Sequence, residues 1–152
     1  MRLDVDILAL QDTKLAVVPP ERARAAARSQ FLHFAPGHAV RPGTTRSVQG
    51  FSCGVGFLMK AGVAVAVATP KGPAWRRLHE QGRIHAVFLG RRPGLPDGLL
   101  VFTVYAPVPE ATAKKAAFVV YMLELVRSLD MQVPTLLLGD FNGSVIPERD
   151  YC

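Results

Sequence analysis

Cysteine is scarce in this chain, which has two among 152 residues, Cys53 and Cys152. Two cysteines cannot build a disulfide framework or the usual four-ligand zinc site, so a reducing compartment is the default expectation. Long apolar runs are also missing, because no uninterrupted stretch reaches the roughly 18 residues of a membrane-spanning helix. Acidic residues near the N-terminus stand where a signal peptide would continue its apolar core. The sequence therefore predicts an intracellular protein with no membrane span.

Acidic residues are outnumbered, since 12 Asp and Glu face 18 Lys and Arg, which gives a net charge of +6. This excess favours anionic partners such as nucleic acid, with a merely solvated basic surface as the alternative. Hydrophobic residues make up 49% of the chain, enough for one globular core. We find no repeats, low-complexity tracts or linkers, and we expect residues 1–152 to form a single mixed domain rather than a regular strand-helix alternation.

Short apolar runs bounded by glycine, proline and polar residues predict strands. These runs are 5–10, 31–34, 54–60, 62–69, 83–89, 99–105 and 135–138. The runs 83–89 and 99–105 predict an antiparallel hairpin. Helices are expected over 21–30 and from residue 107 to about 129, where a stripe formed by Phe118, Met122, Leu125 and Leu129 has helical spacing. Residues 36–53 indicate a long loop, and 75–80 fit either a helical turn or a loop.

The segment that is most informative about function is 133–142, Val-Pro-Thr-Leu-Leu-Leu-Gly-Asp-Phe-Asn. Its apolar run predicts a strand, and Asp140 and Asn142 follow where that strand ends. On an extended segment two residues that are two apart point to the same side. An apolar strand that delivers a carboxylate and a carboxamide is typical of a buried sheet with a polar site at its rim. The alternative is a simple turn, because Asp, Asn and Gly are turn formers.

The segment 139–142, Gly-Asp-Phe-Asn, resembles the GDFN motif of the endonuclease/exonuclease/phosphatase superfamily, the DNase I-like and exonuclease III-like enzymes. Three further segments resemble that family in the expected order: 6–14 its "DIxxLQETK" strand, 54–59 its "GGVAIL" strand, and 101–107 its "NxYAP" strand. The resemblance implies an α+β fold, a two-sheet β-sandwich flanked by helices. It covers nearly the whole chain but only part of the family domain, so we expect a domain truncated at both ends.

The resemblance also assigns site residues. Asp12 stands where the family has a glutamate that holds a divalent metal, Mg²⁺ or Mn²⁺. Asp140 resembles the catalytic aspartate that orients or deprotonates the attacking water. Asn142 resembles the asparagine that positions the phosphate, and Tyr105 resembles the tyrosine near the scissile phosphate.

The family histidine that contacts the scissile phosphate lies beyond the GDFN motif, whereas all four histidines here precede Asp140: His33, His38, His79 and His85. The implied function is Mg-dependent phosphodiester hydrolysis on nucleic acid, with DNA as the favoured substrate. The enzyme would be an endonuclease of the repair type or the retroelement type, and a nuclear location is one option. Two alternatives stay open: a non-catalytic fragment or pseudoenzyme of the same fold, and an inositol-phosphate-type phosphatase. The sequence does not give the oligomeric state.

Overall fold

The computed structural model describes residues 6–13, 30–35, 38–39, 51–52, 54–60, 63–108, 111–129 and 132–143. In chain order its elements are β1 (Ile7–Leu10), β2 (Gln30–Ala35), β3 (His38–Ala39), β4 (Phe51–Ser52), β5 (Val55–Lys60), β6 (Val65–Val67), α2 (Pro73–Glu80), β7 (Ile84–Leu89), β8 (Leu99–Tyr105), α3 (Thr112–Ser128) and β9 (Thr135–Asp140). Within these residues no helix is long and apolar enough to cross a membrane.

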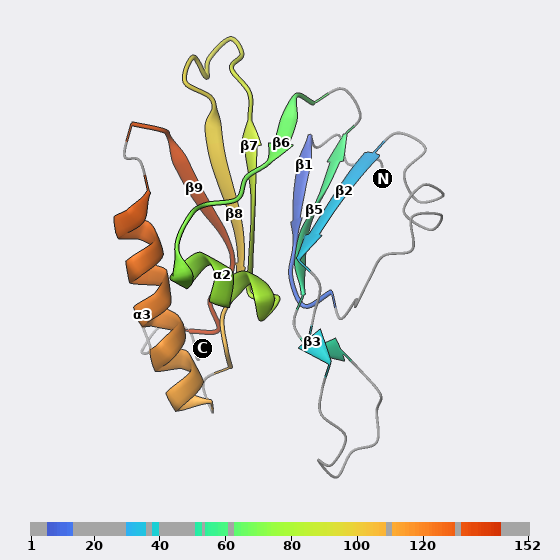
Figure 1. Cartoon of the computed structure of the whole chain (residues 1–152). Coiled ribbons are helices and arrows are strands. Elements are labelled where there is room, and N and C mark those ends of the chain that lie inside the picture. Colours follow the sequence, from blue (N-terminus) through green and yellow to red (C-terminus); the bar gives the residue numbers. More distant parts are fainter. Residues whose placement is uncertain are drawn as a thin grey trace, which may run out of the picture.

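The described elements form three layers (Figure 1). A four-stranded sheet, in the order β6-β7-β8-β9, lies in the middle and is antiparallel except for its parallel β8–β9 pair. A three-stranded antiparallel sheet, β1-β5-β2, packs against one face, and α2 and α3 cover the other. The expected two-sheet α+β sandwich is therefore confirmed, and β3 and β4 form a separate two-stranded ladder.

Alternation along the strands explains how the middle sheet serves two cores. Ile84 and Ala86 of β7 point toward the helices, whereas Val87 and Leu89 point toward the second sheet. The helix-side core is the larger one, and its biggest members are Trp75, Leu78, Ile84, Phe102, Phe118, Met122 and Leu125. The core between the sheets contains Phe57, Met59, Val87, Leu89 and Val101. The predicted stripe on the long helix is confirmed, because three of its members are buried and Leu129 packs against them.

The structure corrects several sequence-based expectations. The strand predicted over 62–69 is only β6, and it pairs with β7, so the chain passes here from one sheet to the other. Of the two options for 75–80 the helical one is confirmed: residues 73–80 are helical, with a proline at the first turn, where its missing N–H costs nothing. The long helix starts at Thr112 and not at Pro107. The Ala106 N–H still bonds to the Asp140 carbonyl, so the chain is paired with β9 up to that residue.

Three further differences concern loops and edges. The region predicted as a loop over 36–53 contains β3 and β4. The helix predicted over 21–30 lies outside the described residues except for Gln30, which belongs to β2, and Cys53 and Cys152 also lie outside them. β9 is not a buried strand: among the described strands it forms an edge of its sheet, and Leu136 and Leu138 are exposed.

Candidate active site

The ends of β8 and β9 bring two predicted site residues into one register pair. Tyr105 lies opposite Asp140 in the parallel ladder, and the next residue, Ala106, donates its N–H to the Asp140 carbonyl at 2.8 Å. Side chains alternate along a strand and paired residues share a face. Tyr105 and Asp140 therefore leave the sheet on the face that also carries Val101, which is the face toward the second sheet.

Gly139 allows this close approach of the two strands. Its φ is +150°, and a Cβ at this position would lie 2.0 Å from the Val104 carbonyl oxygen. A contact that short with a backbone atom cannot be relieved by a side-chain rotation. Any other residue at position 139 would push β9, and with it Asp140, away from Tyr105.

Asn142 sits in a tight turn after the strand. Its φ of 44° is left-handed, its backbone N–H donates to Asp140 Oδ1 at 2.8 Å, and its Nδ2 donates to the Ala106 carbonyl at 2.8 Å. The prediction that Asn142 continues an extended segment is wrong, because asparagine tolerates the left-handed region and the Asp140 carboxylate closes the turn. The two interpretations of this motif are thus not exclusive: the turn itself joins Asp140, Asn142 and the end of β8.

Asp12 follows β1 at the same end of the sandwich. It is half-buried and has a left-handed φ of 49°. Its two neighbours fix its place: Gln11 Nε2 donates to Thr103 Oγ1 at 2.9 Å, and the Thr13 N–H donates to the Gly54 carbonyl at 3.0 Å. Thr103 precedes Tyr105 by two residues on β8 and shares its face, so the end of β1 lies over the strand that carries Tyr105.

Two cationic side chains at this end were not singled out from the sequence. Arg83 precedes β7, and its carbonyl accepts from the Tyr105 N–H at 2.9 Å. Its Nη1 donates to the Tyr105 carbonyl at 3.2 Å, and its guanidinium carbon lies 5.3 Å from the Tyr105 ring centroid. Lys115, in the first turn of α3, donates from Nζ to the Asn142 carbonyl. The signal for Arg83 is its register position opposite Tyr105, which becomes visible only once the β7–β8 hairpin is paired.

The oxygen donors at this end fit a hard divalent cation in type. Mg²⁺ commonly takes one or two protein carboxylates and completes its shell with water. Asp12 supplies a carboxylate, and the neighbouring Thr13 hydroxyl is buried with no hydrogen-bond partner among the described residues. The described part of the chain contains no cluster of three or more His, Cys, Asp or Glu residues that could hold a metal.

The fold and the arrangement at its rim define a protein of the DNase I-like, two-sheet class. Residues 2–146 match the sequence profile of the Endonuclease/Exonuclease/phosphatase family, and the chain belongs to this family. Its fold is similar to the crystal structure of the Xenopus laevis APE2 catalytic domain, with a TM-score of 0.63, 21% identity, and coverage of 95% of this chain and 52% of that chain. The chain thus spans about half the length of that structure. No curated protein matches it.

Family membership and fold class, both predicted from the four motif segments, are therefore confirmed. The structure pairs Tyr105 with Asp140 in the β8–β9 ladder, and hydrogen bonds join Asn142 to Asp140 and to Ala106. It places Asp12 between two residues that contact β8 and Gly54. The chemical roles of these four residues stay predictions.

Proposed function

We propose that this protein is a divalent-metal-dependent phosphodiesterase that acts on DNA. The observation that carries the proposal is the unit at the ends of β8 and β9, where Tyr105 is paired with Asp140 and the Asp140 carboxylate accepts from the Asn142 N–H. This unit coincides with the motifs by which the chain resembles its family, and the similar solved structure is that of a catalytic domain. Because this chain spans about half of that structure, its activity as an isolated chain is part of the proposal.

Asp140 is the proposed group that orients the attacking water or accepts its proton. Its side chain is exposed, so water can reach it, and one carboxylate oxygen is held by the Asn142 N–H. That bond fixes the direction of the carboxylate, and the remaining lone pairs are available to water. A positioned carboxylate of this kind contributes a rate factor of about 10²–10⁴ as a general base.

Asn142 and Tyr105 are the proposed phosphate-positioning groups. The Asn142 amide nitrogen carries two hydrogens, and one of them is used in the 2.8 Å bond to the Ala106 carbonyl. The other can donate to a phosphate oxygen without adding charge to the site. Arg83, over the Tyr105 ring, adds a fixed positive charge beside the phosphate that Tyr105 would approach.

Asp12 is the proposed metal ligand, with the Thr13 hydroxyl as a further oxygen beside it. When bound, a divalent ion supplies charge neutralisation on the phosphate and lowers the pKa of coordinated water. Aspartate is one methylene shorter than the glutamate of the family pattern, so we expect weak metal binding that needs millimolar Mg²⁺ or the more tightly bound Mn²⁺.

DNA is the proposed substrate because of charge. The chain carries a net charge of +6, and the two cationic residues that contact the site, Arg83 and Lys115, would face a polyanion. A basic surface of this kind favours nucleic acid over small phosphoesters.

The test is nicking of supercoiled plasmid by the purified chain with Mg²⁺, with Mn²⁺ and with a chelator. Asp140→Asn is compared with Asp97→Asn, which removes the same charge from an exposed residue in the β7–β8 loop. We expect metal-dependent nicking that falls about 100-fold or more in Asp140→Asn and is unchanged in Asp97→Asn. A folded chain that does not nick, or nicks equally in both variants, overturns the proposal and favours the non-catalytic alternative. Release of phosphate from inositol phosphates but not nicking would favour the phosphatase.

A further inference from the structure

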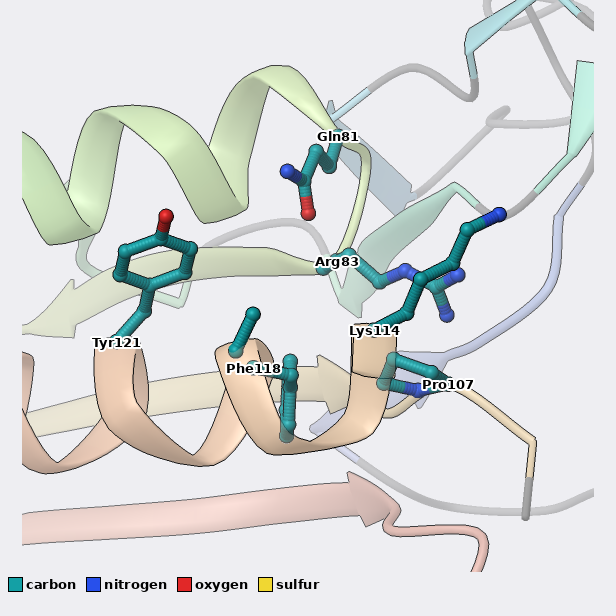
Figure 2. A pocket seen from close by; sticks show the side chains of 7 residues that line it. Gln81, Arg83, Pro107, Lys114, Phe118 and Tyr121 are labelled. Atoms are coloured by element: carbon teal, nitrogen blue, oxygen red, sulfur yellow. The ribbon is translucent and has the colours of Figure 1, made fainter. Parts of the chain in front are cut away.

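A pocket of about 290 Å³ lies between α2, α3 and the turn at Pro107, on the helix side of the middle sheet (Figure 2). It is distinct from the Asp140 carboxylate and the Asn142 amide, neither of which lines it. Its walls come from three parts of the chain: Gln81 and Arg83 between α2 and β7, Pro107 after β8, and one face of α3. The pocket falls near the lower end of the range of roughly 300–1,000 Å³ that is usual for small-molecule sites.

One end of the pocket is cationic. Arg83 and Lys114 line it from different elements, and Figure 2 shows both side chains at the end near Pro107. None of the described residues that line the pocket is acidic. The first described turn of α3 also contains no acidic residue, although acids there would stabilise the positive end of the helix dipole. Among the described residues, no carboxylate of the pocket wall or of this helix turn offsets the charges of Arg83 and Lys114.

Toward Tyr121 the pocket is polar, and Gln81 projects over its middle, near the apolar Phe118. Figure 2 shows the Tyr121 hydroxyl and the Gln81 amide reaching into the space between α2 and α3. Arg77 Nη1 donates to the Tyr121 oxygen at 2.6 Å and its guanidinium carbon lies 5.2 Å from the ring centroid, so the hydroxyl is held and keeps its own hydrogen to donate. Phe118 supplies an apolar wall between the two ends.

We propose that this pocket binds a nucleoside monophosphate-type ligand. The phosphate would lie between Arg83 and Lys114, and the flat base would pack on the Phe118 wall. Its polar edge would meet Gln81 and Tyr121, which together offer both donors and acceptors. The volume suits one nucleotide and not two. The ligand can be a free nucleotide or the 5′-phosphorylated terminal nucleotide of a strand, since both present the same chemistry.

Occupancy of the pocket would also reach the candidate active site, because the Arg83 guanidinium contacts both the pocket and the Tyr105 carbonyl. The proposal does not depend on phosphodiesterase activity. Binding can be measured with a chelator present, so its failure leaves the catalytic proposal untouched.

The test is isothermal titration of the full chain with dAMP in EDTA at physiological ionic strength, beside deoxyadenosine, inorganic phosphate and a 5′-phosphorylated trinucleotide. Lys114→Gln is compared with Arg127→Gln, which removes one charge from an exposed residue of the same helix outside the pocket. We expect one dAMP per chain, weaker binding of phosphate, no binding of deoxyadenosine, and a loss of at least tenfold in Lys114→Gln against less than twofold in Arg127→Gln.

A third variant, Tyr121→Phe, should weaken dAMP several-fold but leave inorganic phosphate unchanged, because it removes the hydroxyl that would contact the base, together with its bond from Arg77, and keeps both Arg83 and Lys114. Tighter binding of dAMP than of the trinucleotide identifies the free nucleotide as the ligand, and the reverse order identifies the strand terminus. Absence of dAMP binding, equal losses in Lys114→Gln and Arg127→Gln, or equal affinities for dAMP and phosphate overturn the proposal.

Discussion

Replacement of Gly139 by alanine tests how closely β9 approaches β8 at the candidate site. The added methyl group would lie 2.0 Å from the Val104 carbonyl oxygen and 2.8 Å from both the carbonyl carbon and the nitrogen of Val104. The strands must separate by roughly 1 Å or more before that contact becomes acceptable. The φ of +150° adds strain, because L-residues rarely adopt it.

The expected cost follows from these two terms. Strain at an unfavourable φ costs about 1–3 kcal/mol, and forced overpacking costs about 1–3 kcal/mol. Their sum is about 2–6 kcal/mol, which corresponds to a ~30-fold or larger increase in the opening of the β8–β9 pair. The single tryptophan, Trp75, is buried in the helix-side core and reports global unfolding by fluorescence, while exchange of the Ala106 amide reports the opening of β9.

Two other glycines separate the cost of the unfavourable φ from the cost of overpacking. Gly94 has a positive φ of +84° but no atom within 4 Å of an added Cβ, so Gly94→Ala measures strain alone, about 1–2 kcal/mol. At Gly90 the nearest atom is 3.7 Å away, in ordinary contact, and Gly90→Ala should change stability by less than about 1 kcal/mol. If Gly139→Ala costs no more than Gly94→Ala by both measurements, the close approach of the strands is refuted.

Two further predictions concern His79 and Asn142. Burial lowers the pKa of His79 below its ordinary value of 6.5, with the charge of Glu80 opposing part of that shift, so the unfolded chain binds a proton here more readily than the folded one. The stability that depends on neutral His79 is therefore complete above pH ~6.5 and is lost as the pH falls toward the pKa of the folded state. In His79→Gln the free energy of unfolding, measured by denaturation at about pH 5 and about pH 8, should differ less between the two pH values than in the wild type. An unchanged difference contradicts the assignment to His79. Asn142→Ala and Asn142→Gly both lose the bond to the Ala106 carbonyl, but only alanine is strained by the φ of 44°. Asn142→Ala should therefore be less stable than Asn142→Gly by about 1 kcal/mol in urea denaturation. Equal stabilities of the two variants would contradict the left-handed turn.

Much of the fold can be read from the sequence because apolar periodicity is local. The β7–β8 hairpin, the buried stripe of α3 and the strand before Asp140 were all predicted within a few residues of their observed bounds. Partner choice is not local: the alternating valines of β6 suit either sheet, and only the packing of the whole chain places them beside β7. Likewise, solvent exposure of an apolar run such as Leu136 to Leu138 depends on whether a neighbouring strand is present.

The candidate site shows the same limit. Asp140, Tyr105 and Asn142 were identified by motif, and their mutual contacts follow from parallel pairing of β8 with β9. Arg83 was not identified from the sequence, because an arginine before a strand has no distinctive spacing. It gains its position only through the register of the β7–β8 hairpin. The turn at Asn142 was one of two alternatives from the sequence, since the motif residues are compatible with both an extended segment and a turn, and its left-handed φ decides between them.

The open edge of β9 has a practical consequence for work with this protein. Among the described strands nothing pairs with its outer side, and Leu136 and Leu138 are 42% and 36% exposed. An edge with free backbone groups and apolar side chains is a template for pairing with a second chain, so this is the place where purified material would aggregate at high concentration. A lysine in place of Leu136 is the natural solubilising change, because it blocks such pairing and leaves the turn at Asp140 and Asn142 intact.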